Sequence, residues 1–560
     1  MKNRQIYLYL TAIICLGAIF RFSHLNLKSL WLDEIITAIF SLGRSYQDIP
    51  LDTVFPLQQL QDIFTWQPGV SCSQIADNLA NDSTHPPLFF CGMYGWLGWL
   101  NSWDIDWIIK LRFLPALFGV VSIIAIYIVN SAAFSTSSGI FTALIMSLSP
   151  FAVYLSQEAR HYTLPMLLII LSLFAVIKIQ KNIFFDHDSQ FRFWLLWIIA
   201  NTIGLYTHYF CILAFNAEII TLLLLIYRGR EKVINFQKIC LHLIFSIITV
   251  IIGYLPWILT TFSHVRKSET NWLPSPQHVE PIYQTLLNWV LMIITFPVEN
   301  QPLTIQIFSG AVMVIFTLVI GFQIIRNLIK LWFHQEIHLS IFTLGSFGFF
   351  VILQFFVIAY GLGKDITIVP RYSFVYYPSF CALLAIGLEK LKISKYLFLI
   401  VGIISCIFVV NNLAFQKPFF PDQVAKNMNI EPDIPVMLVI KYDNYQDVAG
   451  GLSFAVALNQ ERSNNQDSLA FLKNSFDLAN LDQKLSNFST PNKSQFHLWF
   501  IGSSIEREDF AKNFQITTTT TCNIDTNHHH RTGRFPYQLY RCKSGDQGDQ
   551  EVRSSRSQEF

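Results

Sequence analysis

Residues that could do chemistry recur in five separate segments of an otherwise apolar chain. They are Asp33, Glu34, His85, Arg112, Glu158, Arg160, His208, Arg371 and Tyr372. A carboxylate beside a low-dielectric surface is a good general base, because partial desolvation raises its pKa toward neutral pH. Arginine forks match the oxygens of a phosphate group. These residue types predict a base together with a phosphate-binding group.

Each of these groups also has a purely structural alternative. The adjacent carboxylates could simply form an acidic helix N-terminus. Arg112 and Arg371 could be anchors that snorkel to the membrane surface, and Glu158 with Arg160 could be a weak surface ion pair. His208 could be an interfacial histidine with its hydrogen bonds satisfied. A functional site is favoured because all these groups fall on one predicted side of a membrane.

The composition indicates which elements must hold these groups. The 560 residues are 52% hydrophobic, 15% aromatic and 14% charged, whereas soluble domains carry roughly 25% charged residues. The chain is therefore predicted to be an all-α polytopic membrane protein. A net charge of +2 without a long basic run gives no case for nucleic acid. Lys2 and Arg4 precede the first apolar segment, which no cleavage site follows, so we predict a retained span.

Eleven apolar stretches are candidates for crossing a bilayer, which takes about 17–25 residues. They are Ile6–Phe22, Leu111–Ser131, Ile140–Leu155, Tyr162–Ile179, Phe193–Tyr206, Phe210–Tyr227, Ile239–Thr261, Thr304–Ile325, Ile341–Leu362, Tyr372–Leu388 and Leu397–Asn412. Two shorter stretches, Leu88–Leu100 and Pro281–Pro297, predict interfacial or re-entrant helices. With a cytoplasmic N-terminus, eleven crossings put the Lys and Arg clusters in the cytoplasm and the C-terminus outside.

A change of composition near residue 414 predicts a second domain. We expect a membrane domain over 1–413, with its first external loop at 23–110, and a small extracytoplasmic α/β domain over 414–543. Residues 544–560 are polar and predict a disordered tail. The strand-like runs are Val436–Ile440, Phe496–Ile501 and Pro536–Tyr540, and the helical-looking stretch is Leu469–Leu485.

Cysteine and histidine usage gives little sign of a metal site. Six cysteines lie in or near apolar segments and are expected to act as small hydrophobic residues: Cys15, Cys91, Cys211, Cys240, Cys381 and Cys406. Cys72, Cys522 and Cys542 lie in polar stretches, and an exported compartment permits a Cys522–Cys542 disulfide, with free thiols as the alternative. His528-His529-His530 is expected to be a solvated loop. There is room for a divalent metal near His85 and Glu158, but no spacing demands one.

The order of the motifs resembles glycosyltransferase family 39, which contains the protein O-mannosyltransferases and the aminoarabinose transferase that acts on lipid A. The motifs are Leu30-Trp31-Leu32-Asp33-Glu34, His85-Pro86-Pro87-Leu88, Arg112 with Pro115-Ala116-Leu117-Phe118-Gly119, and Ser149-Pro150 with Ser156-Gln157-Glu158-Ala159-Arg160. The resemblance covers roughly the first 230 residues, and Arg371-Tyr372 fits less closely. It implies the GT-C fold, a multispanning helical enzyme with its active site on the outer face.

The resemblance also implies a reaction. The donor would be a sugar on undecaprenyl or dolichyl phosphate, and the acceptor an extracytoplasmic lipid, glycan or protein. Asp33 would be the base, Glu34 its neighbour, and Arg112 the arginine at the outer end of a span. Many relatives have an Asp near the second external turn, where this chain has Tyr162 and Thr163. We predict inverting transfer of a hexose or pentose at the cell membrane.

Three other functions remain open at this point. A ligase that transfers a whole glycan would share this topology. A transporter of lipid-linked sugars would need ionisable groups inside spans, for which Glu218 is a candidate, but no inverted repeat is visible. A membrane scaffold would use the C-terminal domain as its binding module.

Overall fold

The computed structural model describes residues 3–186, 190–230, 236–265, 272–473, 495–503, 505–517 and 520–544. The chain divides into two compact units. The first unit comprises Met1–Leu27 and Ser71–Gln416, and the second comprises Lys28–Val70 and Lys417–Phe560. The sequence assigned residues 28–70 to an external loop of the membrane domain, whereas in the structure they fold with the C-terminal residues.

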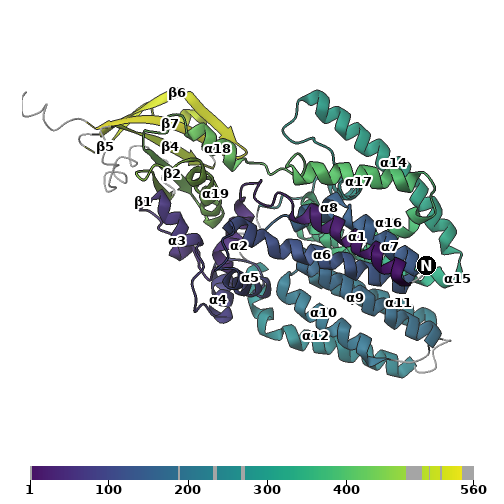
Figure 1. Ribbon diagram of the computed structural model, residues 1–560. Coiled ribbons are helices and arrows are strands. Elements are labelled where there is room, and N and C mark those ends of the chain that lie inside the picture. The colour runs from purple at the N-terminus through teal and green to yellow at the C-terminus, as the bar shows by residue number, and fades with distance from the viewer. Residues whose placement is uncertain are drawn as a thin grey trace, which may run out of the picture. The chain divides into compact units, whose positions relative to one another are not determined.

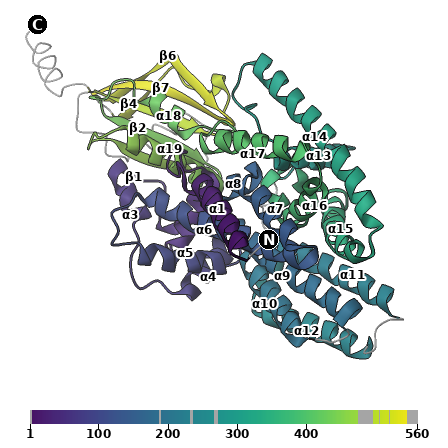
Figure 2. The same ribbon diagram turned by 45° about the vertical axis from the view of Figure 1, so that its right-hand side comes forward.

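The first unit is helical (Figure 1). In chain order its helices are α1 (Asn3–Phe22), α4 (Cys72–Asp82), α5 (Leu88–Trp99), α6 (Trp107–Ala133), α7 (Thr136–Ser147), α8 (Pro150–Ser156), α9 (Thr163–Lys181), α10 (Phe191–Thr207), α11 (Cys211–Gly229), α12 (Phe236–Val265), α13 (Glu280–Ile293), α14 (Leu303–Trp332), α15 (Gln335–Phe356), α16 (Tyr377–Glu389) and α17 (Ser394–Val410). Helix α10 packs between α9 and α12, as both Figure 1 and Figure 2 show. Every predicted span falls on one of these helices or on a consecutive pair of them.

The helix lengths confirm a multi-pass membrane protein. Among the described residues, seven helices are long and apolar enough to cross a membrane, or eight if the bent pair α7 and α8 forms one crossing. The predicted crossings on α10, α16 and α17 correspond to helices of 17, 13 and 17 residues. Because a crossing helix needs about 20 residues, the count of eleven stays a prediction.

The predicted span Ile140–Leu155 is broken, with α7 and α8 meeting at 61°. Pro150 begins α8, and the Ser149 hydroxyl caps it by accepting from the amide of Ala152. Proline cannot donate a backbone hydrogen bond, so carbonyls at the end of α7 need other partners. Arg21, which is fully buried, donates to the carbonyls of Met146 (2.9 Å) and Ser147 (3.3 Å). Arg21 therefore supplies the hydrogen bonds that these carbonyls lose at the break.

Two more side chains hold the end of α1 in the same way. Gln157 donates from Nε2 to the carbonyls of Phe20 (3.1 Å) and Ser23 (2.9 Å). Arg112 donates from Nη1 to the carbonyl of Leu25 at 2.6 Å. We call Arg21, Arg112 and Gln157 the α1 brace. Gln157 and Arg112 donate to carbonyls at or just beyond the end of α1. Arg21, in the last turn of α1, donates to carbonyls at the break between α7 and α8.

The second unit is an α/β domain around a seven-stranded sheet of order β1-β3-β2-β4-β7-β6-β5. The strands are β1 (Val54–Pro56), β2 (Val436–Tyr442), β3 (Ser468–Lys473), β4 (Gln495–Gly502), β5 (Asn513–Thr517), β6 (Thr520–Thr532) and β7 (Phe535–Ser544). The helices are α2 (Leu32–Ser41), α3 (Leu60–Phe64), α18 (Pro421–Met428) and α19 (Tyr445–Glu461). Strands β3, β2 and β4 are parallel, and the other neighbours are antiparallel.

The three predicted strands are confirmed, and two other expectations for this unit are wrong. The start of Leu469–Leu485 is strand β3 rather than helix, because a buried strand is apolar on both faces and resembles a buried helix. His528–His530 belong to strand β6 rather than to a loop. The rest of the helical-looking stretch (474–485) and residues 545–560 of the predicted tail lie outside the described residues.

Two disulfides are formed. Cys522 and Cys542 face each other across β6 and β7 and are bonded, which confirms that pairing. The second bond joins Cys72 at the start of α4 to Cys91 in α5. The expectation that Cys91 is merely a small hydrophobic residue was wrong, since its apolar helix lies against the polar helix that carries Cys72.

A cationic cluster as the candidate active site

Six side chains from four separate loops meet in the first unit. The loop between α8 and α9 supplies three consecutive residues, and the others come from the chain before α5, the turn between α10 and α11, and the short helical segment Pro370–Val375. We call them the cationic cluster: His85, Arg160, His161, Tyr162, His208 and Arg371. Four of the six were predicted as site residues, and the fold brings those four together.

His85 is held from both sides of its ring. Its Nε2 lies 3.0 Å from Nη2 of Arg160, and its Nδ1 lies 3.0 Å from the Ser83 hydroxyl. Because a guanidinium only donates, Nε2 must be the acceptor, so the proton of the neutral ring lies on Nδ1. Arg160 itself is buried. The contact thus fixes the orientation of the guanidinium relative to the His85 ring.

His161 lies at the centre of the cluster and is fully buried. Its ring centroid is 5.0 Å from that of His85 and 4.7 Å from that of His208. Among the described residues, neither of its ring nitrogens has a hydrogen-bond partner. Burial first, and then the charges of His208, Arg160, His85 and Arg371, hold its pKa well below the usual value. The ring is therefore neutral at physiological pH and retains one donor and one acceptor.

Aromatic rings position the remaining cations. Arg371 donates from Nε to the Tyr162 hydroxyl at 3.0 Å and lies 5.6 Å from the centroid of the Tyr372 ring. The guanidinium of Arg160 lies over the ring of Tyr162, with its Cζ atom 5.6 Å from the ring centroid. The Nδ1 atom of His208 accepts from the amide of Phe210 at 3.0 Å, and burial lowers its pKa well below the ordinary value. Tyr372 thus flanks the cluster.

The cluster is suited to an anion. Two guanidinium groups and three imidazoles share a small, largely buried volume, so an oxyanion there would meet several donors in a low-dielectric setting. Three imidazoles could also suggest a metal. Among the residues described, however, no three His, Cys, Asp or Glu side chains have a geometry that could hold a metal ion, and Arg160 adds positive charge beside His85.

The other predicted site residues occupy different surroundings. Arg112 is buried and belongs to the α1 brace. Glu158 is buried in the loop that carries Arg160. Asp33 and Glu34 lie in the second unit, at the start of α2. Glu34 is fully buried and its Oε2 accepts from the amide of Trp31 at 3.4 Å, whereas Asp33 is partly exposed. Of the two carboxylates, Asp33 is the accessible one.

Two members of the cluster, His161 and Tyr162, were not singled out from the sequence as site residues. His161 directly follows Arg160 in a polar loop between two apolar segments, and that position was the available signal. Glu218, the residue that a transporter would need, is fully buried inside α11 and accepts from Trp197 (2.7 Å) and Asn201 (3.0 Å), with Ser172 as a further partner. Such a carboxyl joins helices and does not line a pathway.

Comparisons with known proteins agree with this architecture. A family model described as dolichyl-phosphate-mannose-protein mannosyltransferase matches residues 95–257. That stretch includes Arg160, His161 and His208 of the cationic cluster. No curated protein sequence matches the chain at a significant level.

Solved structures extend the similarity to nearly the whole chain. The chain is similar to the crystal structure of ArnT from Cupriavidus metallidurans in the apo state, with 9% identity, a TM-score of 0.52, and coverage of 96% of this chain and 98% of that one. The same protein bound to undecaprenyl phosphate gives 10% identity with equal coverage and TM-score. The S. cerevisiae Pmt1-Pmt2 complex bound to the sugar donor is a weaker match, at 14% identity, 47% and 34% coverage and a TM-score of 0.33.

At such low identity the likeness to ArnT shows a shared fold, and the family match adds the kind of activity. The helical bundle, its apolar spans and the C-terminal sheet are all elements of that fold. The family match over residues 95–257 and the fold shared with ArnT together support glycosyltransferase activity for this multi-pass membrane protein.

Proposed function

We propose that the protein transfers one sugar from a polyprenyl-phosphate donor to an extracytoplasmic acceptor. The cationic cluster carries this proposal, because a phosphate diester needs several donors in a buried setting and the cluster offers them. Arg160 and Arg371 hold the phosphate oxygens, and His161 offers a donor to the same anion. The bound undecaprenyl phosphate in the ArnT structure supports the choice of carrier lipid.

The proposed chemistry is a single displacement with inversion. The acceptor oxygen attacks the anomeric carbon while Asp33 takes the hydroxyl proton. The bond between that carbon and the phosphate oxygen breaks, and its electron pair stays on the phosphate, where the cationic cluster stabilises the added charge. Arg112 remains a further proposed phosphate ligand because of its place in the motif order, and it also donates to the carbonyl of Leu25.

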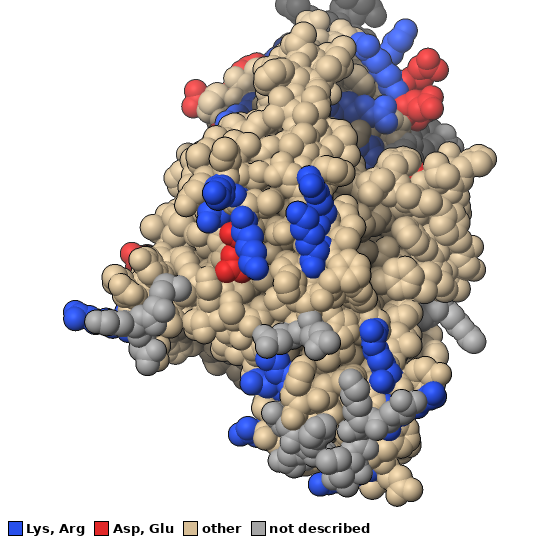
Figure 3. All heavy atoms as spheres, turned by 90° about the vertical axis from the view of Figure 1, so that its right-hand side faces the viewer, with Lys and Arg blue, Asp and Glu red and all other residues tan. Residues whose placement is uncertain are grey.

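The proposed orientation places the N-terminus in the cytoplasm and the catalytic loops outside, in the cell membrane. Helices α9, α11 and α14 each carry Lys or Arg in the last turn. Figure 3 shows the face at which the N-terminus lies in Figure 1, and on it Lys and Arg are spread more widely than Asp and Glu. This distribution supports the orientation through the positive-inside rule.

Transfer of labelled sugar from undecaprenyl-phosphate donors in membranes tests the proposal. Matched amounts of wild type, Asp33→Asn and Arg160→Ala are compared, together with donor binding in the same membranes. We expect Asp33→Asn to lower turnover by about 100- to 10,000-fold while donor binding persists, because a lost general base has effects of that size. Arg160→Ala should lose donor binding as well.

Two results would overturn these assignments. Full turnover in Asp33→Asn would remove Asp33 as the base and make Glu158 the next candidate. A wild type that neither binds nor consumes any polyprenyl-phosphate sugar would remove the donor class.

A further inference from the structure

The segment that carries Asp33 is built into the C-terminal part of the chain. Strand β1 pairs with β3 and extends the sheet. Asp52 accepts from the amide of Lys473 at 2.9 Å and from the Tyr442 hydroxyl at 3.0 Å. Gln58 donates to the carbonyl of Asn464 at 2.9 Å. These contacts make residues 28–70 an integral part of the second unit.

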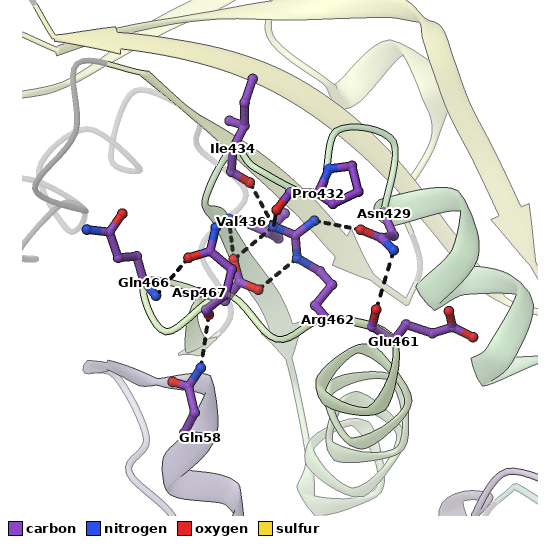
Figure 4. A network of polar contacts seen from close by, with 10 residues as sticks. Gln58, Asn429, Pro432, Ile434, Val436, Glu461, Arg462, Gln466 and Asp467 are labelled. Atoms are coloured by element: carbon purple, nitrogen blue, oxygen red, sulfur yellow. Dashed lines mark hydrogen bonds and ion pairs between the residues drawn. The ribbon is translucent and has the colours of Figure 1, made fainter.

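Figure 4 shows what lies behind the Gln58 contact. Arg462 and Asp467 form a buried ion pair, with 2.7 Å between Nε and Oδ2. Asp467 also accepts from the amide of Val436 at 2.8 Å, and Arg462 donates to the carbonyl of Ile434 at 2.7 Å. A buried pair with this many hydrogen bonds is rigid. The segment is therefore attached to a fixed part of the domain.

Helix α2, which begins just before Asp33, lies on helix α19. At one end of the contact the Ser453 hydroxyl donates to the carbonyl of Leu30 at 2.5 Å, and this bond is buried. At the other end the rings of Tyr46 and Tyr445 stack with centroids 4.4 Å apart. The helix is thus held at both ends by residues of α19.

The residues immediately before Asp33 are packed as tightly. Leu32 packs against α19 at Gly450, where an added Cβ would lie 3.7 Å from Cδ1 of Leu32 and more tightly, at 3.3 Å, against Cζ of Phe535. The Nζ atom of Lys417 lies 4.1 Å from the centroid of the Trp31 ring. The C-terminal part of the chain therefore contacts Leu30, Trp31 and Leu32 in turn.

We propose that α19 is the positioning element of the catalytic base, with Ser453 and Gly450 as positioning residues. The inference rests on the proposed function, in which Asp33 accepts the proton of the acceptor. It gives the C-terminal domain a part in turnover that is separate from any binding of the acceptor. The physical reason is that a base acts only within hydrogen-bond reach, and a displacement of about 1 Å can cost about 100-fold in rate.

The test compares two buried serines of the second unit in the full-length protein in lipid nanodiscs. Ser453→Ala removes the bond from α19 to the carbonyl of Leu30. Ser503→Ala removes a buried hydroxyl bond to the carboxylate of Asp447, also in α19 (3.2 Å), and leaves the contacts between α19 and residues 28–70 in place, so it controls for a general loosening of α19. We expect Ser453→Ala to lower kcat by about tenfold with donor KM within about twofold. Ser503→Ala should leave both within about twofold. Equal losses in the two variants, or a change confined to donor KM, would overturn the proposal.

A second measurement separates this inference from the proposed function. Amides of Glu34 and Ile35 bond to the carbonyl of Trp31, so their hydrogen exchange reports how firmly the start of α2 is held. Ser453→Ala should speed their exchange by about tenfold relative to Ser503→Ala. If wild type transfers no sugar, the proposed function fails and this exchange still decides the positioning. Identical exchange in both variants would refute the positioning even in an active enzyme.

Discussion

The first unit holds buried or half-buried arginines in two regions, and the contacts described for them differ. In the α1 brace, Arg21 and Arg112 donate to backbone carbonyls of the end of α1 and of the break after α7. In the cationic cluster, Arg160 and Arg371 contact the side chains of His85 and Tyr162. Burial of an arginine in a membrane protein is therefore not in itself a sign of substrate binding.

The difference follows from what each partner can do. A carbonyl left without an amide partner is a fixed acceptor, and a guanidinium that satisfies it completes the fold. An imidazole or a phenol can instead reorient or change its protonation state, and the cluster gathers several such groups around more positive charge. The partners of each arginine thus separate a structural role from a binding role, and four experiments test that separation.

The largest expected effect concerns Arg21. Arg21→Met leaves the carbonyls of Met146 and Ser147 without their donor in a buried place, so we expect a loss of about 2–4 kcal/mol in the free energy of unfolding. The melting temperature of the purified protein reports it. Arg4→Met is the control, since Arg4 is exposed in the same helix. An unchanged melting temperature combined with lost donor binding would move Arg21 into the binding group.

The next effect concerns the cationic cluster. Arg160→Ala should weaken binding of a polyprenyl-phosphate sugar by about 100-fold, because a charge-assisted contact to phosphate is lost. The melting temperature without donor should fall less than in Arg21→Met, since Arg160 contacts the side chain of His85 and not the backbone carbonyls of a helix break. Arg192→Ala, at an exposed arginine, should bind donor normally. A large loss of stability with normal donor affinity in the surviving protein would make Arg160 structural.

A charge-conserving pair sharpens the comparison further. Arg371→Lys keeps the charge and loses the planar fork, so donor affinity should fall by about tenfold. Arg112→Lys should leave donor affinity within about twofold if the α1 brace is its whole role. Isothermal binding curves of both variants decide the case. A fall of about tenfold in Arg112→Lys would establish the phosphate contact that its place in the sequence predicts.

The smallest expected effect is a pH dependence with two parts. As the pH falls, the stability of the free protein should decrease and its affinity for the donor should increase. Burial lowers the pKa of His161 well below its ordinary value of 6.5. Unfolding restores that value, so the unfolded chain binds more protons and the free protein loses stability as the pH falls below 6.5. An anion beside the ring raises its pKa, so donor affinity should rise by about threefold as the pH falls from about 7.5 to about 6.

His161→Gln provides the control for both halves of this prediction. The variant should lose the pH dependence that His161 contributes to donor affinity and part of the pH dependence of its melting temperature, while His208 retains its share. Parallel titrations in which wild type and His161→Gln respond alike would place the titrating group elsewhere.

Much of the helical unit could be predicted, because long apolar stretches have few other structures in a membrane. The break after α7 was missed, although Ser149 and Pro150 are visible in the sequence. The mean hydropathy of a long window stays high when it includes a single proline, so the stretch was predicted as one span. The start of α16 was missed as well, because the predicted span began at Tyr372, which lies in the separate short helical segment Pro370–Val375. Strand β1 was out of reach, since three residues carry no pattern of their own and their partner lies in β3.

The site was predictable to the extent that residue type reveals function. His85, Arg160, His208 and Arg371 stand out because ionisable residues are rare beside apolar spans, and the fold gathers them. The role of Arg112 in the α1 brace could not be predicted, because its partner is the backbone of Leu25 and a carbonyl leaves no trace in a sequence. The attachment of Asp33 to α19 depends on long-range packing, which needs the structure.

The pairing of β1 with β3 also has a consequence for biosynthesis. Gln58 and Asn464, which the sheet brings together, are 406 residues apart. Residues 28–70 leave the ribosome early, yet their partners appear only after the helices of the first unit have been made. The segment must therefore persist without its final neighbours throughout membrane insertion, and long-range pairing of this kind closes slowly. The pairing of β1 with β3 can therefore form only late in synthesis, and a chain truncated before α19 would leave the helix of Asp33 without its support.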